Sequence, residues 1–203
     1  MISAIGRARA YPGEPRSGDA VLIEEVQGRV LLALVDALGH GPVAASAADL
    51  AVATIREHRN ERPARILQAC HERLLRGRGA AISVITFDAS GHGVFAGVGN
   101  VSARVYPESR HNPVLLPGSG VIGYRHRTLR EVEFRLAGDS VGLLYSDGIS
   151  SRVDPIDRSR LTLAEASKQL LADFGKPTDD ASLILFAHRG SPRFAPEHEA
   201  AVR

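Results

Sequence analysis

The sequence RVLLALVDALGHGP, residues 29–42, decides the fold. Its apolar part, Val30–Val35, predicts a β-strand. Asp36 follows directly, and Gly41-Pro42 then begins a helix, because proline is favoured in the first turn of a helix. This segment therefore places an acid at the end of a hydrophobic strand, with glycine close by in the sequence.

The composition is that of one globular domain. Of the 203 residues, 44% are hydrophobic and 24% are charged, which are average values for a single soluble domain. The 25 basic residues alternate with acids, whereas a nucleic-acid-binding protein would show a basic stripe. We find no apolar stretch long enough to cross a membrane and no secretory signal at the N-terminus. We therefore expect a cytoplasmic protein with one domain over residues 1–188, a loose C-terminal tail over residues 189–203, and neither nucleic acid nor membrane as a partner.

The order of the predicted elements indicates an α+β protein. Alternating or continuous apolar runs predict strands, and apolar residues at helical spacing predict three helices. The helices are expected over 41–59, from 63 to a stop at 77–79, and over 161–174; the strands over 2–10, 20–26, 30–35, 81–87, 92–98, 101–106, 114–116, 121–124, 132–136, 141–145 and 181–186. Since strands and helices do not alternate, we expect two antiparallel sheets packed face to face and flanked by helices.

Three further acids share the context of Asp36. Asp19 precedes a strand, Asp147 follows another, and Asp179 lies just before the last strand. Each alone could be an ordinary local feature: Asp36 and Asp147 could cap helices, and Asp19 and Asp179 could be turn residues. As a set they favour divalent cations, because Mg²⁺ and Mn²⁺ prefer oxygen ligands and several acids without a counter-cation repel one another.

These acids carry a family resemblance. In chain order, the motifs Gly18-Asp19, Asp36-x-x-Gly39-x-Gly41, Ser146-Asp147-Gly148 and Asp179-Asp180-Ala181-Ser182 resemble the metal-dependent (type 2C, PPM) serine/threonine phosphatases. The sequence is most similar to their short bacterial branch, the SpoIIE-like sporulation and stressosome phosphatases, over about residues 15–188. The resemblance implies an αββα sandwich that carries two divalent cations, Mn²⁺ or Mg²⁺, at one end.

The resemblance also assigns roles to residues. Asp36 and Asp147 would be the central catalytic acids, and Asp36 would bridge both ions. The backbone carbonyl of Ala37 would complete the coordination of one ion, Asp147 and Asp179 would bind one ion, and Asp19 would act on the other. Three residues are assigned to positions beside these ligands: Asp180, Gly39 and Asn100.

Three positions depart from the family pattern. Leu38 occupies the place where eukaryotic members have a histidine proposed as general acid, so His40 is either a proton donor or a loop or capping residue. Asn100 stands where many relatives have an Asp linked to a third ion, which predicts a site of two ions. Arg16 lies nearest to the motifs as a candidate for binding the substrate phosphate, although it could also be simply solvated.

The activity implied by the resemblance is hydrolysis of phosphoserine or phosphothreonine. A hydroxide held between the two ions would attack phosphorus. The implied substrates are phosphorylated STAS-domain proteins of a stressosome, whose dephosphorylation would reset stress signalling. Two alternatives remain open at this point: a non-catalytic module that binds phosphoproteins, and a hydrolase of small phosphoesters or nucleotides.

Overall fold

The central strand of the fold is β3 (Arg29–Ala37), which forms from the apolar run quoted above. In the computed structural model, which describes residues 1–106, 114–156, 161–189 and 191–195, this strand is buried on both faces. Its odd-numbered residues 31–37 pack under two helices, and its even-numbered residues 30–34 pack against a second sheet. Because successive side chains of a strand point to opposite faces, β3 contributes side chains to two separate cores.

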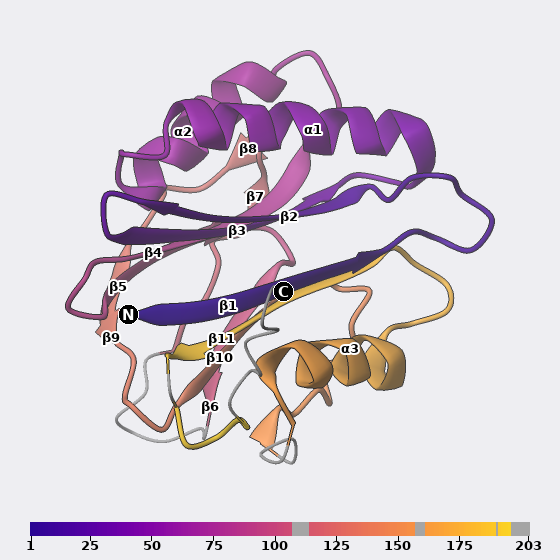
Figure 1. Cartoon of the computed structure of the whole chain (residues 1–203). Coiled ribbons are helices and arrows are strands. Elements are labelled where there is room, and N and C mark those ends of the chain that lie inside the picture. Colours follow the sequence, from indigo (N-terminus) through magenta and orange to yellow (C-terminus); the bar gives the residue numbers. More distant parts are fainter. Residues whose placement is uncertain (107–113, 157–160, 190, 196–203) are drawn as a thin grey trace, which may run out of the picture.

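The strands form two antiparallel sheets that face each other (Figure 1). The five-stranded sheet has the order β2-β3-β4-β5-β9 and the four-stranded sheet the order β1-β11-β10-β6, while β7 and β8 make a separate hairpin. The remaining strands are β1 (Ile2–Arg9), β2 (Asp19–Val26), β4 (Ala80–Phe87), β5 (His92–Val98), β6 (Ser102–Tyr106), β7 (Gly120–Val121), β8 (Arg125–His126), β9 (Val132–Arg135), β10 (Val141–Tyr145) and β11 (Ala181–His188).

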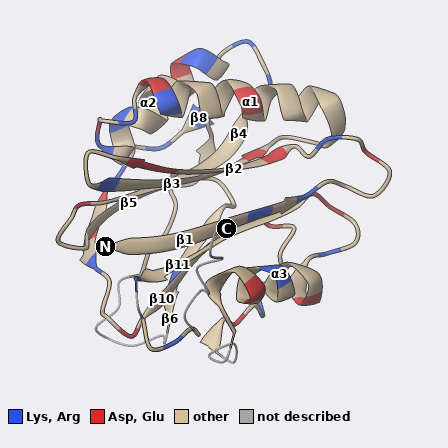
Figure 2. Cartoon of the chain, in the orientation of Figure 1, with Lys and Arg blue, Asp and Glu red and all other residues tan. Residues whose placement is uncertain are grey.

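Helices cover the outer face of each sheet (Figure 1). Helices α1 (Gly41–Glu57) and α2 (Pro63–Leu74) lie on the five-stranded sheet, and α3 (Leu163–Phe174) lies on the four-stranded sheet. The layers are thus helix, sheet, sheet and helix, which confirms the predicted αββα sandwich. Charged residues lie on the helices and loops and along parts of β1 and β2 (Figure 2).

Several element boundaries differ from the sequence predictions for local reasons. Helix α2 ends at Leu74, before the predicted stop, because Leu75 leaves the helical conformation. Helix α3 begins at Leu163, since Thr162 and Glu165 form a capping box there. The strand expected over residues 114–116 is absent from the described chain, and the backbone instead reaches β5 through a single bridge at Gly118.

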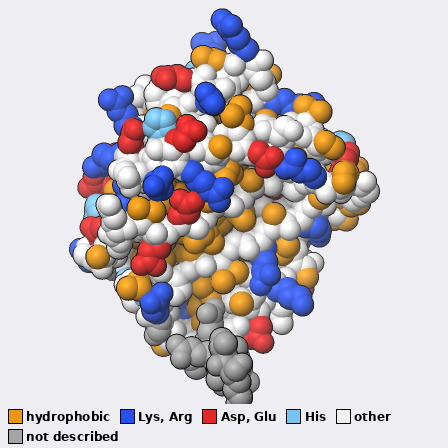
Figure 3. Space-filling model, turned by 45° about the horizontal axis from the view of Figure 1, so that its top comes forward, with side chains coloured by type: hydrophobic (Ala, Val, Ile, Leu, Met, Phe, Trp, Pro, Cys, Tyr) orange, Lys and Arg blue, Asp and Glu red, His pale blue; other side chains and the backbone are white. Residues whose placement is uncertain are grey.

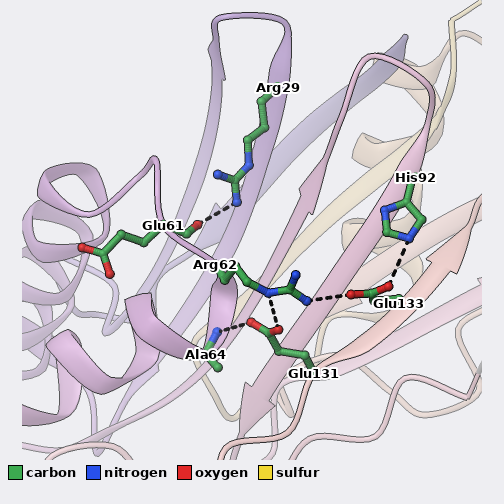
Figure 4. A network of polar contacts seen from close by, with 7 residues as sticks. All are labelled: Arg29, Glu61, Arg62, Ala64, His92, Glu131 and Glu133. Carbon is green, nitrogen blue, oxygen red and sulfur yellow. Dashed lines mark hydrogen bonds and ion pairs between the residues drawn. The ribbon is translucent and has the colours of Figure 1, made fainter.

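A polar network connects the helical layer to the five-stranded sheet near Arg29, the first residue of β3 (Figure 4). Arg62, just before α2, contacts Glu131 at 2.6 Å and Glu133 at 2.7 Å, and His92 lies 3.6 Å from Glu133. Arg29 donates to the carbonyl of Glu61 at 2.7 Å. Arg62 and Glu133 are exposed, so each pair of this network contributes little free energy, but together they fix the α1–α2 connection far from Asp36.

Part of the predicted tail lies against the body of the protein. The amide of Ala195 donates to the carbonyl of Leu161 at 2.8 Å, and Phe194 packs on the core under α3. Residues 190 and 196–203 of that tail lie outside the described residues, and the boundary at 188 stays a prediction. Among the described helices, none has the length and apolar character needed to cross a membrane.

Candidate active site

Two of the predicted acids are neighbours across a sheet. Asp19 is the first residue of β2, and Asp36 is the last but one of β3; the two are directly opposite in the antiparallel register. Asp19 is buried and accepts a hydrogen bond of 2.8 Å from the hydroxyl of Ser182. The amide of Ala37 donates to the carbonyl of Gly18 at 3.1 Å, which closes the end of this strand pair.

The other two acids come from the opposite sheet. Asp147 follows β10 and is exposed, and the side-chain amide of Asn100 donates to its carboxylate at 2.6 Å. Asp179 lies two residues before β11 and is half-buried. Ser146 connects the end of β10 to the start of β11. Its amide donates to the carbonyl of Ser182 and its hydroxyl accepts from the Ser182 amide, both at 3.0 Å.

Asp180 joins the two sheets. Its carboxylate is buried and accepts hydrogen bonds from the backbone amides of Tyr11, at 2.7 Å, and Gly18, at 2.9 Å. It therefore holds the β1–β2 loop against the start of β11. Gly148 lies beside it, and a Cβ there would overlap the Asp180 carbonyl, so the Ser146-Asp147-Gly148 motif requires glycine at its third position.

The acids raise one another's pKa values. Burial raises the pKa of Asp36 to about 8, with further contributions from the negative charges of Asp19, Asp147, Asp179 and Asp180. Burial also raises the pKa of Asp19 to about 6, although hydrogen bonds from Ser146 and Ser182 oppose this. The pKa of Asp179 is raised by burial and by the charge of Asp147. The structure therefore brings all four strand-end acids, and Asp180, into one electrostatic cluster.

The cluster has few basic neighbours among the described residues. None of its five carboxylates forms an ion pair with a described residue. The charge of Lys176 acts weakly against the raised pKa of Asp179, but its ammonium donates to the backbone carbonyl of Asp147. In the part of the chain that the structure describes, no three Asp, Glu, His or Cys side chains are already arranged as a metal site. The donor chemistry nevertheless fits a hard divalent cation: several oxygens, few competing cations and raised pKa values.

The two doubtful candidates both have other partners. His40 precedes α1 but makes no capping hydrogen bond; its Nδ1 lies 2.9 Å from a Glu14 carboxylate oxygen, and its ring stacks on Tyr11 with centroids 4.5 Å apart. Arg16 is exposed and pairs with Asp49 of α1 at 2.6 Å. Each of the two side chains therefore contacts residues outside the acid cluster, and the role of each stays a prediction.

The structure adds contacts near Asp36 that the sequence did not predict. Arg78 donates to the carbonyl of Leu38 at 2.6 Å, and its guanidinium covers Gly39, which has a positive φ of 82°. Glu14 covers Gly41 in a similar way. Arg78 belongs to the Arg78-Gly79-Ala80 segment before β4, yet its contact with residues 40 positions earlier could be recognised only once the two strands had been placed side by side.

Comparisons with known proteins agree with this geometry. The family model of stage II sporulation protein E (SpoIIE) matches residues 26–189. A solved chain from work on the bacterial stressosome, described as a modular system adapted to control secondary messenger signaling, is 30% identical, with a TM-score of 0.85 over 92% of this chain and 99% of that one. A comparison with curated proteins gave no match.

Two further structures share the fold at lower identity. RsbX in complex with magnesium is 19% identical, with a TM-score of 0.79 over 91% of this chain and 94% of that chain. The PP2C phosphatase domain of SpoIIE from Bacillus subtilis, solved with a fragment of its regulatory domain, is 15% identical, with a TM-score of 0.73 over 92% of this chain and 63% of that chain. The αββα sandwich is therefore common to all of them.

Proposed function

Because the chain belongs to the SpoIIE family of PPM-type phosphatases, we propose that it is a metal-dependent serine/threonine protein phosphatase. One observation carries the proposal within this chain. Four carboxylates from the ends of separate strands, Asp19, Asp36, Asp147 and Asp179, lie within electrostatic reach of one another without a basic partner among the described residues. Such a cluster suits cations that in turn bind a phosphate.

The proposed cofactors are two divalent cations, Mn²⁺ or Mg²⁺. Asp36 would bind both, with Asp19 and the carbonyl of Ala37 on one side and Asp147 and Asp179 on the other. RsbX, which has the same fold, was solved in complex with magnesium, and this supports the choice of ion. When bound, the cations would activate a water for attack on phosphorus and neutralise charge on the phosphate oxygens.

The surrounding residues orient these ligands. The hydroxyl of Ser182 donates to Asp19, and the side-chain amide of Asn100 donates to Asp147. Asp180 accepts from two loop amides and is thereby a positioning residue: it holds Gly18, and with it Asp19, beside Asp36. Removing the Asp180 charge would loosen the ligand set without removing a ligand.

The proposed substrates are phosphorylated STAS-domain proteins of a stressosome. Two similarities support this substrate class: the 30% identical chain from work on the stressosome, and the likeness to RsbX. Dephosphorylation of such a protein would reverse the action of its kinase and reset the signalling complex. The hydrolysis reaction itself requires only an accessible phosphoserine or phosphothreonine, whatever the oligomeric assembly of the substrate protein.

Phosphate release tests the proposal directly. The purified chain is incubated with p-nitrophenyl phosphate, with a phosphoserine peptide and with a nucleotide, each with Mn²⁺, with Mg²⁺ and with excess EDTA. We expect turnover of the first two with either cation and loss of turnover with EDTA, while the far-ultraviolet circular dichroism stays unchanged because the aliphatic core supplies the stability. Full activity in EDTA would contradict the metal mechanism; no turnover at all would favour a binding module, and preference for the nucleotide a small-molecule hydrolase.

A further inference from the structure

A hollow of about 370 Å³ lies between the N-terminal half of α1 and the C-terminal end of α2. Leu50 and the buried Leu74 contribute to its apolar lining. Val43 and Leu75 also line it and are 61% and 48% exposed. Large apolar side chains gathered around one surface depression, rather than scattered singly, are typical of a protein interaction site.

The hollow is basic as well as apolar. Arg73, Arg76 and Arg78 line it, and its lining includes no acidic residue. The side chains of Arg73 and Arg76 have no hydrogen bond or ion pair with any described residue, and the side chain of Arg78 donates to the carbonyl of Leu38. Basic residues are visible on α2 in Figure 2, and basic side chains project from the helical layer in Figure 3.

Three other arginines in or beside the helical layer differ in this respect. Arg16 pairs with Asp49, Arg56 with Glu24, and Arg62 with two glutamates, so their charges are locally neutralised. Arg76 in addition has a positive φ of 72°, a conformation that few bulky residues adopt. Unneutralised positive charge around an apolar depression attracts a ligand that offers both negative charge and apolar side chains.

The hollow is connected to the candidate active site by its third arginine. Arg78 contacts the carbonyl of Leu38, and the amide of Leu38 donates to the carbonyl of Gly79 at 2.9 Å. Leu38 is only two residues beyond Asp36 and is itself 43% exposed. A segment seated in the hollow would therefore end beside the loop that carries the proposed metal-bridging acid.

We propose that this hollow docks an acidic, leucine-containing segment of the phosphorylated substrate protein. Apolar side chains of the segment pack against Val43, Leu50 and Leu75, and its carboxylates pair with Arg73 and Arg76. The identity of the partner as substrate rests on the proposed phosphatase function, whereas the chemistry of docking does not. The docking site adds affinity for the protein substrate and leaves the hydrolysis of a small phosphoester unchanged.

Binding is measured first, without catalysis. A fluorescein-labelled peptide in which leucine alternates with glutamate is compared by anisotropy with a matched peptide that has lysine in place of glutamate. We expect the glutamate peptide to bind about tenfold more tightly at low salt, and the difference to shrink as salt screens the exposed charges. The double variant Arg73→Glu with Arg76→Glu should lose this preference.

Two further variants separate charge from packing. Arg65→Glu is the matched control, because Arg65 is exposed on the same helix but lies outside the hollow; it should keep the preference for glutamate. The double variant Val43→Ser with Leu75→Ser should weaken the binding of the glutamate peptide. All of these side chains are exposed, so the variants should fold, and circular dichroism checks this.

The same peptides joined to a phosphoserine test the link to turnover. For the glutamate peptide, Arg73→Glu with Arg76→Glu should raise KM about tenfold with little change in kcat, and should leave p-nitrophenyl phosphate hydrolysis unchanged. Equal binding of the two peptides, retention of the preference in the double variant, or self-association of the chain that this variant abolishes would each overturn the docking proposal. A wild-type chain that binds the glutamate peptide but hydrolyses neither substrate would instead overturn the phosphatase proposal and leave the docking site standing.

Discussion

The two halves of the candidate site hold their carboxylates in different ways. Asp19 and Asp36 lie within adjacent strands of the five-stranded sheet, directly opposite each other in a continuous antiparallel ladder. Asp147 and Asp179 lie in loops at the ends of β10 and β11, where Asp147 is exposed and Asp179 half-buried. The first pair can move only if strand hydrogen bonds break, whereas the second pair can shift with its loops.

This difference suggests a division of labour at the site. Of the strand-borne acids, Asp19 is buried and Asp36 is partly buried, so their charged forms are costly without a cation, and the pKa of Asp36 is raised to about 8. The loop acids remain closer to solvent and can adjust when a phosphate or a cation arrives. The rigid half would then set where the ions bind, and the loop half would close around them.

The largest effect is expected for Asp36→Asn. This substitution removes the one acid assigned to both cations, so turnover of p-nitrophenyl phosphate should fall by about 10²–10³-fold. It also removes a carboxyl group that burial and the neighbouring acids keep protonated at a cost to folding, because burial raises the pKa of Asp36 to about 8. The Tm of the metal-free protein should therefore stay the same or rise. Steady-state kinetics with Mn²⁺ and a thermal melt in EDTA measure the two outcomes.

The matched variant on the loop side is Asp147→Asn, which should cost less turnover than Asp36→Asn. Asp147 is exposed and assigned to a single ion, and its loop can readjust. Equal and mild losses in the two variants would contradict both the bridging role of Asp36 and the proposed division between strand and loop acids.

A smaller effect is expected for Asp180→Asn, which weakens the connection between the two halves. The Asp180 carboxylate accepts hydrogen bonds from the backbone amides of Tyr11 and Gly18. In the Asn variant, one of these two backbone N–H groups would face the side-chain NH₂ group and lose its hydrogen bond. The free energy of unfolding should fall by about 1–3 kcal/mol and turnover by about tenfold. Asp49→Asn is the control, since this exposed acid has only a surface pair with Arg16 and should change neither quantity. A loss of turnover as large as that of Asp36→Asn would make Asp180 a ligand.

The pH dependence of stability sharpens the contrast between the halves. The folded state retains a proton on Asp36 up to about pH 8, whereas the unfolded chain releases it near 3.8. The folded state therefore binds more protons in this window, and the free energy of unfolding falls as the pH rises. We expect the Tm of the metal-free protein to drop by about 5 °C between pH 5.5 and 8.

The control for this pH effect is Asp36→Asn, whose Tm should depend much less on pH because it lacks the titrating group. Added Mn²⁺ should reverse the trend, since its ligands bind in their deprotonated form. A Tm that rises with pH in the metal-free protein, or a wild-type slope retained in Asp36→Asn, would show that Asp36 is not the group responsible.

The sequence predicted those features of the fold that depend on local pattern. The apolar run of residues 30–35, the Gly41-Pro42 helix start and the motif acids are all readable within a few residues, and each lies at the strand or helix end where it was expected. Contacts between the sheets were not predictable. Ser182 meets Asp19 across 163 residues of sequence, and Asp180 meets the Tyr11 amide across 169, so both contacts depend on how the two sheets pack.

Side chains with several available partners were equally hard to assign. Arg16 is next to a motif in the sequence but turns to Asp49 on α1, while Arg78, far from Leu38 in the sequence, reaches its carbonyl. A long basic side chain can reach many partners, and its choice is a property of the folded surface rather than of its neighbours in the sequence. The roles of the individual site residues therefore stay predictions for the variants described here.

The smallest effect is expected for His40→Ala. His40 lies in the loop between the rigid acid Asp36 and helix α1, where it stacks on Tyr11 and pairs with Glu14. These contacts hold the ring against the β1–β2 loop, so we expect a structural contribution and a loss of turnover within about tenfold. A general acid would have to reach the leaving oxygen, and losing one typically costs about 10²–10⁴-fold. Comparing two substrates makes the test sharp, because the serine alkoxide released from a phosphopeptide needs a proton far more than p-nitrophenolate does. A small and equal loss on both substrates supports the structural role; a loss beyond a hundredfold on the phosphopeptide alone, at unchanged Mn²⁺ affinity, would make His40 the general acid.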